Sequence, residues 1–248
     1  MKQGRWIAAI CVAAIAIGVA GSVIAGGSQH RDIFVGKTKA SALSNGEVLS
    51  LRDENDAVLF LSEVDGILKG WADNNPGWNA ADGSAAGEEP MSQGAQLFFE
   101  VSGFDGAFKA YDQVFNILHD DGDMGELGGH DLHVHYTWHV DTQDAEFDAD
   151  RVGWTGAYEI VDLGTTEYGA APHAVFFRPE ACASVIEGDV DQDGIVSPLD
   201  IQAFWSVVAD PSAATMQERC ACDLNHDGIA SADDAPYLMS QMKNVRLF

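Results

Sequence analysis

The chain has 248 residues, of which 39 are acidic and 13 are Lys or Arg, giving a formal net charge of −26 at pH 7. A hydrophobic content of 46% is enough to build a folded core, which excludes a disordered chain. The negative charge repels nucleic acid and anionic membranes, so neither is an expected partner. Such a surface is typical of a soluble extracellular protein or of a calcium-binding protein.

Residues 1–25 have the pattern of a signal peptide. Lys2 and Arg5 give a positive start, residues 7–19 are apolar, and Val23-Ile24-Ala25 fits a cleavage site of the small-x-small kind. The alternative is an uncleaved membrane anchor, but the apolar run is short for a membrane span of about 20 residues. The sequence therefore predicts a secreted or cell-surface protein that has no membrane segment after cleavage.

Residues 26–181 are expected to form one β domain. Short runs with alternating or β-branched and aromatic residues occur at 57–64, 95–101, 131–140, 156–161 and 174–177. Polar segments at 73–89 and 120–129 are expected to be long loops between them. Because no long amphipathic helix separates the runs, the pattern favours a mainly β fold, an antiparallel β-sandwich, over a parallel sheet.

Four histidines lie in one ten-residue stretch of this domain, residues 130–139. Three of them, His133, His135 and His139, would share one face of a continuous strand. Histidines two residues apart on a strand suit a zinc or copper site, and His30 or His173 would supply a further ligand. The alternative is a solvated sheet face on which neutral histidines are polar spacers. Zinc is therefore a candidate cofactor of the β domain.

The C-terminal part contains a duplicated acidic loop with an offset of 34 residues. Calcium binds six to eight oxygens, which such a loop supplies from positions 1, 3, 5, 7 and 12, with Gly at position 6. The first loop supplies Asp189, Asp191, Asp193, Ile195 and Asp200 at the ligand positions. The second supplies Asp223, Asn225, Asp227, Ile229 and Asp234. Residues at helical spacing follow each loop, so the sequence predicts two calcium ions, with the second loop as the weaker candidate.

The duplicated loop and helix, with Asp at position 12, resemble the dockerin type I family over residues 182–248. That resemblance implies a small three-helix module that is ordered by calcium and that docks onto a cohesin-like protein. The residues at positions 10 and 11, Pro198 and Leu199 and then Ala232 and Asp233, are not the hydroxyl and polar pairs of cellulosomal dockerins. We therefore expect residues 182–248 to be a C-terminal attachment module, and this expectation does not depend on the residues at positions 10 and 11.

Three cysteines remain after the signal peptide. In an exported protein, a disulfide from Cys182 to Cys220 or to Cys222 would cross-link the module and leave one thiol free. A zinc site built on the Cys-x-Cys pair is the alternative. The sequence does not choose between the two partners of Cys182.

A second, weaker resemblance covers residues 30–180. The segments around His30 and Asp32, the His133-Val-His135 strand, and the segments at 156–158 and 174–179 are similar to a family of secreted bacterial surface proteins of unassigned function. Some members that have a His-x-His strand are associated with zinc-limited growth. The resemblance implies a β-sandwich and metal handling, and it implies no enzyme activity.

The functional interpretation is a secreted or cell-surface binding or structural protein with a calcium-ordered tail. The alternatives are a carbohydrate-binding module, with a carbohydrate or cell-surface component as partner, and a small polysaccharide-degrading enzyme. Tryptophans 71, 78, 138 and 154 could stack on sugars, although core positions are more usual for Trp. No pair of carboxylates stands out, and no Gly-x-Ser-x-Gly or His-Glu-x-x-His motif occurs, so the balance is against an enzyme.

Overall fold

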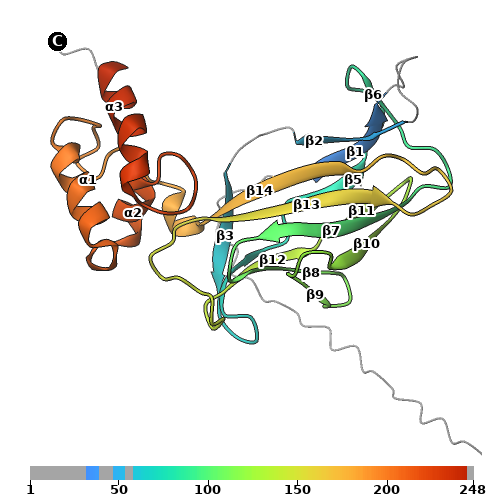
Figure 1. Ribbon diagram of the computed structural model, residues 1–248, viewed down its shortest axis with the longest axis horizontal. Coiled ribbons are helices and arrows are strands. Elements are labelled where there is room, and N and C mark those ends of the chain that lie inside the picture. The colour runs from blue at the N-terminus through green and yellow to red at the C-terminus, as the bar shows by residue number, and fades with distance from the viewer. Residues whose placement is uncertain (1–31, 39–46, 54–57, 245–248) are drawn as a thin grey trace, which may run out of the picture.

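The computed structural model describes residues 32–38, 47–53 and 58–244. The chain is mainly β as far as Pro179 and helical beyond it, so the predicted mainly β fold followed by C-terminal helices is confirmed. Figure 1 shows the helices gathered at one end of the molecule, next to β3 and β14. We call residues 32–179 the β region and residues 180–244 the helical region. The predicted signal peptide and His30 lie outside the described residues.

The β region contains two sheets. The smaller one has the order β11 (His133–Val134), β5 (Gly77–Ala80), β1 (Asp32–Thr38) and β2 (Leu49–Asp53), with β6 (Glu88–Glu89) also paired to β1. The larger one is nearly closed and has the order β10 (Met124–Gly129), β7 (Gln96–Phe104), β13 (Trp154–Asp162), β14 (Ala171–Pro179), β3 (Leu59–Val64), β4 (Gly70–Asp73), β12 (Thr137–Asp141), β8 (Phe108–Tyr111) and β9 (Ile117–Leu118). Most strand pairs are antiparallel, as expected, but β1 pairs with β5, and β14 with β3, in parallel.

Alternating burial places the core of the β region. Every second residue of β13 from Trp154 to Asp162 is buried, and the same period holds for Leu97, Phe99 and Val101 on β7. Trp78 of the smaller sheet contacts Phe99 and Tyr158 of the larger sheet, with ring centroids 5.5 and 5.8 Å apart. Aromatic side chains from both sheets therefore share one core, and they fix the smaller sheet against the larger one.

Two predicted loops contain strands. The segment 73–89 includes β5 and β6, and the segment 120–129 includes β10. Their Gly, Asn and Asp residues indicated turns, but pairing with β1 and with β7 supplies the backbone hydrogen bonds of these segments. The predicted strand at 131–140 is divided instead. Its first part is β11 in the smaller sheet, and its second part is β12 in the larger sheet.

The helical region has three α-helices and three short 3-10 turns among the described residues. They are η1 (Glu180–Cys182), α1 (Asp200–Ala209), η2 (Pro211–Ala213), α2 (Met216–Cys222), η3 (Ala232–Asp234) and α3 (Ala235–Asn244). Helices α1 and α3 follow the two acidic loops, as their apolar spacing predicted. Helix α2 leads directly into the second loop, and no apolar spacing in the sequence had predicted it. Its signal was the Thr215-x-x-Glu218 capping box, in which both reciprocal hydrogen bonds form.

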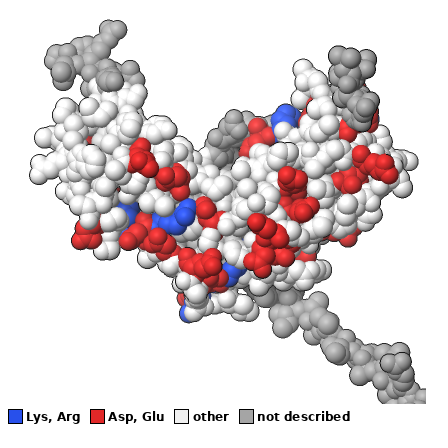
Figure 2. Space-filling model, viewed as in Figure 1, with Lys and Arg blue, Asp and Glu red and all other residues white. Residues whose placement is uncertain are grey.

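The surface is acidic, as the composition indicated. Figure 2 shows Asp and Glu side chains over both regions on the face in view, with few Lys or Arg among them. None of the described helices is both long enough and apolar enough to cross a membrane.

Candidate metal centres

Three side chains of the smaller sheet converge on one point. Asp32 begins β1, His133 lies on β11, and His135 follows β11 directly. Strand β5 lies between the other two, because Asp32 pairs with Gly77 and His133 pairs with Asn79. Two segments about a hundred residues apart are therefore joined across one central strand, and their side chains reach the same place.

The donor atoms of this Asp32–His133–His135 trio have the spacing of metal ligands. The two Nε2 atoms lie 3.2 Å apart, and Asp32 oxygens lie 3.4 Å from His135 Nε2 and 3.9 Å from His133 Nε2. Ligands about 2.0–2.1 Å from a tetrahedral zinc ion are about 3.3 Å from one another. The Asp32 side chain is 7% exposed, that of His135 20% and that of His133 55%, so the trio is open to solvent on one side.

Neighbouring groups fix the orientation of the trio. The Nδ1 atom of His135 lies 2.8 Å from the backbone carbonyl of Asn74, which can only accept, so Nδ1 carries the proton. The Nε2 lone pair of the neutral ring then points towards the other two residues. A Cβ atom at position 77 would lie 2.5 Å from the His135 ring, so Gly77 makes the room that the ring occupies. Asn79 also donates to Asp32, at 3.4 Å.

Two further predicted ligands, His139 and His173, do not join the trio. His139 lies on β12 in the larger sheet, because the chain changes sheet between His135 and Thr137. The expectation that it shares a face with His133 and His135 is therefore wrong. His173 lies on β14, where its ring contacts Tyr158 at 5.5 Å. Among the described residues, only Asp32 joins His133 and His135 in a possible metal-ligand group.

His139 belongs to the core. It is 1% exposed, it contacts the Tyr111 ring, and its Nε2 donates to the Lys69 carbonyl at 3.1 Å. Burial lowers the pKa of His139 below its ordinary value of 6.5, so the ring is neutral at pH 7. His139 is thus a core residue with one backbone partner at Nε2, and its Nδ1 atom has no hydrogen-bond partner.

The first acidic loop gathers three carboxylates. Asp189, Asp191 and Asp193 can each place an oxygen within 4.8 Å of the others. Asp200 closes the loop from inside, since it is fully buried and accepts hydrogen bonds from the backbone of Val190, Asp191 and Ser197 at 2.7–3.0 Å.

The second acidic loop repeats the conformation of the first. Asp234 is fully buried and accepts from the backbone of Leu224, Asn225 and Ser231 at 2.8–2.9 Å. Positions 4 and 6 have positive φ in both loops: Gln192 and Gly194 in the first, His226 and Gly228 in the second. Each loop therefore has the sharp turn that the sequence pattern requires.

A further observation points to a cation in each loop. Asp189 is 5% exposed and Asp223 is fully buried, and the Oδ1 atom of each is buried without a hydrogen-bond partner. A partnerless carboxylate oxygen inside a protein is costly, and a bound cation would satisfy it. Both residues occupy position 1, where the calcium pattern requires a direct ligand.

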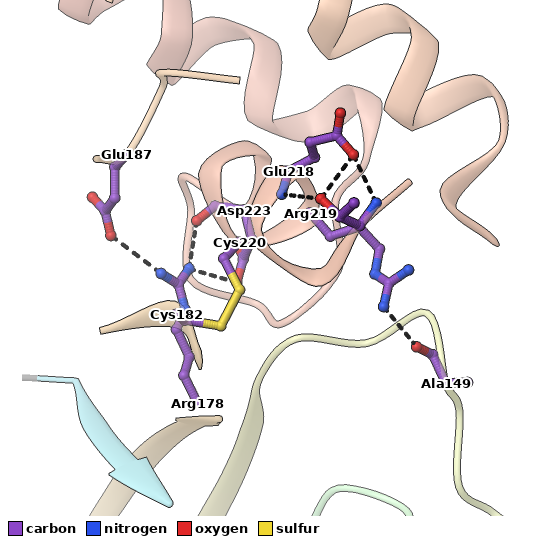
Figure 3. Close-up of a disulfide and its surroundings, with 9 residues drawn as sticks. Ala149, Arg178, Cys182, Glu187, Glu218, Arg219, Cys220 and Asp223 are labelled. Atoms are coloured by element: carbon purple, nitrogen blue, oxygen red, sulfur yellow. Dashed lines mark hydrogen bonds and ion pairs between the residues drawn. A yellow bond between two sulfur atoms is a disulfide. The ribbon is translucent and has the colours of Figure 1, made fainter. Parts of the chain in front are cut away.

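Arg178, which the sequence did not single out, contacts the second loop from the β region. Its Nη2 donates to the carbonyl oxygen and to Oδ2 of Asp223, at 2.6 and 2.7 Å, and its Nη1 pairs with Glu187 at 3.3 Å. Figure 3 shows the Arg178 guanidinium between Glu187 and Asp223, beside the disulfide. The first loop has a different partner at this position, because the Gly194 amide donates to Asp189 Oδ2 at 2.9 Å.

A disulfide joins Cys182 to Cys220, which settles the partner that the sequence left open. It connects the turn after β14 to helix α2, as Figure 3 shows. The alternative of a zinc site on Cys220 and Cys222 is wrong, because Cys220 is oxidised. Cys222 is a free, buried thiol, and burial raises its pKa to about 12, so it stays protonated and unreactive.

The four tryptophans do not form a platform for sugars. Trp78, Trp138 and Trp154 are at most 1% exposed and belong to the core, and Trp71 packs against Trp154 at 5.6 Å. The interpretation of these residues as core aromatics is confirmed for the three buried ones.

The chain shows no detectable similarity to a known protein family. No protein-family model matches the chain, no curated protein matches it, and no solved structure matches it. The two resemblances therefore stay predictions from the residues that carry them.

Proposed function

We propose that this is an exported metal-binding protein. Its β region would hold a transition-metal ion at Asp32, His133 and His135, and its helical region would be a dockerin-like module ordered by two calcium ions. The convergence of the trio is the single observation that carries the first part. Secretion or cell-surface location, a cohesin-like partner of the module and a two-layer sandwich for the β region belong to the same proposal.

The chemistry of the trio favours zinc or copper over calcium. Two imidazole nitrogens and one carboxylate suit borderline metals, whereas calcium prefers oxygen alone. Three protein ligands on a face open to solvent leave further coordination positions accessible. Such a site suits capture or transfer of an ion, and a closed four-ligand site would suit a purely structural ion.

Metal analysis of the full mature chain tests this part. We expect about one zinc or copper ion per chain, and a rise in the thermal midpoint when zinc is added to chelator-treated protein. Asp32→Asn, His133→Gln and His135→Gln should each weaken zinc binding at least tenfold. His130→Gln is the matched control, because this histidine lies on the same segment and pairs only weakly with Asp131, at 3.8 Å. Equal zinc binding by the control and the three variants, or no binding by the unmutated chain, would overturn the trio site.

The calcium part rests on the partnerless oxygens of Asp189 and Asp223 together with the ligand pattern of both loops. Calcium would neutralise carboxylates that lie close to one another, some of them buried, so its binding energy would contribute to folding of the helical region. Calorimetric titration of the full chain should show two calcium ions. Asp189→Asn and Asp223→Asn should each remove one. Absence of heat in the unmutated chain, with a chelator leaving the thermal midpoint unchanged, would refute the module.

A further inference from the structure

We propose that the second acidic loop is a calcium-dependent joint between the helical region and the β region. The inference rests on the calcium part of the proposed function, and it adds a role that the ligand pattern does not contain. The two loops have the same backbone turn, but among the described residues the β region contacts the second loop and not the first.

Two segments of the β region contact the second loop. Val152 donates its backbone amide to the Gly228 carbonyl at 2.9 Å, and Arg151 donates to the Asp227 carbonyl at 3.2 Å. From β14, Arg178 holds Asp223, and the Phe176 ring stacks on His226 with centroids 6.0 Å apart. The contacts therefore come from two segments of the β region and reach positions 1, 4, 5 and 6 of the loop.

The glycine at position 6 shows the difference between the loops most directly. A Cβ atom at Gly194 would meet nothing within 4 Å, whereas a Cβ atom at Gly228 would overlap the backbone of Gly153. The first loop thus faces open space at this point. The second loop is in backbone-to-backbone contact with the β region.

Two of the five residues that would ligate calcium in the second loop, Asp223 and Asp227, also contact the β region. Asp223 would offer Oδ1 to the ion while Arg178 holds its Oδ2 and carbonyl. Asp227 would offer its carboxylate while its carbonyl accepts from Arg151. An ion that fixes this backbone therefore favours the contacts with the β region, and those contacts favour the ion by the same factor.

The disulfide and Arg219 lie beside the joint. Cys182 follows β14 and is bonded to Cys220 on α2, and Arg219 donates to the Ala149 carbonyl at 3.2 Å (Figure 3). The disulfide lies within the helical region and fixes α2 to the turn that directly follows β14, so α2 stays near the end of β14 at all calcium concentrations. Calcium in the second loop would then determine whether the segments 148–153 and 176–178 of the β region keep their contacts with that loop.

Hydrogen exchange of the full chain, measured by mass spectrometry, tests the joint with a matched pair of variants. Asp193→Ala and Asp227→Ala remove the position-5 carboxylate from the first and from the second loop, and these carboxylates make equivalent hydrogen bonds to Ile195 and Ile229. We expect calcium to slow exchange at least tenfold in the peptide 148–155 of the unmutated chain and of Asp193→Ala. In Asp227→Ala this calcium-induced protection should be lost.

Protection that persists in Asp227→Ala overturns the joint, as does a chain that binds two calcium ions in calorimetry without protection of this peptide. A chain that binds no calcium refutes the proposed module itself, so the two failures are distinguishable. If both variants lose protection, a calcium titration of Arg151→Met decides. This change should weaken one of the two sites at least threefold and leave the other unchanged, whereas Arg52→Met, which removes an arginine paired with Glu88, should affect neither. Unchanged affinities in Arg151→Met would overturn the joint.

Discussion

The β region and the helical region bury different kinds of side chain. The β region is built on large aromatic residues such as Trp78, Trp138 and Tyr158, all fully buried. The helical region has a small apolar cluster around Phe204, Val207 and Leu238, and it buries four aspartates as well. Small units rarely gain enough from apolar burial alone, and buried carboxylates add a cost unless a cation or hydrogen bonds compensate. This chain therefore combines a core built on aromatic packing with a smaller one that buries carboxylates and lies next to a disulfide.

The largest expected effect is that of Arg178→Met, which removes the guanidinium group that pairs with the buried Asp223 carboxylate. Breaking a buried pair in this way costs about 3–5 kcal/mol, and we expect a loss of that size in unfolding by urea with chelator present. Saturating calcium should reduce the loss, because the ion compensates the same carboxylate. Arg151→Met should cost less, since its ion pair with Asp105 keeps contact with solvent. An equal loss with and without calcium would argue against charge compensation.

Removing the disulfide is expected to have the next largest effect. The Cys182→Ala, Cys220→Ala double variant opens a cross-link between residues that are 38 positions apart, which typically costs about 2–4 kcal/mol. The helical region should then unfold at a lower chelator concentration, as circular dichroism at 222 nm would report. Cys222→Ala is the control, because this thiol forms no disulfide. If the double variant unfolds no earlier than the control, the cross-link does not support the helical region.

Gly77→Ala tests the metal site of the β region separately from the acidic loops of the helical region. The added methyl group would displace the His135 ring, and we expect zinc binding to weaken about tenfold, equivalent to about 1.4 kcal/mol. Calcium binding should not change, because the trio and the acidic loops do not share a residue. Gly103→Ala is the matched control on another strand, where a Cβ atom meets only Ala157, at 3.9 Å. Zinc affinity that is unchanged in Gly77→Ala would show that the position of His135 is not needed.

The smallest effect that we expect is the pH dependence of His139. Because burial lowers the pKa of this histidine in the folded state, the unfolded chain binds the proton more tightly. The contribution to stability is therefore fully present above pH 6.5 and is lost as the pH falls through the lowered pKa. The thermal midpoint of the β region should fall less between pH 7 and pH 5 in His139→Gln than in the unmutated chain. Parallel pH profiles would contradict this assignment.

The local features of this protein were readable from the sequence. The two acidic loops follow from ligand types at fixed positions within twelve residues, and the positive φ at Gly194 and Gly228 agrees with that pattern. Helix α1 and strands β7 and β13 lie close to the expected positions because their side chains repeat with the helical or strand period. Short β5 and the two-residue β11 have no such repeat, so their pairing could not be predicted.

The non-local features were decided by tertiary structure. Asp32 joins His133 and His135 only because β5 lies between β1 and β11, and His139 leaves them because the chain changes sheet after His135. Arg178 and Asp223 are 45 residues apart in the sequence, and they meet because the helical region packs against the end of β14. Periodicity and motif spacing report what a short segment prefers. Which distant segments meet depends on how the whole chain buries its apolar surface, and that is a property of the complete fold.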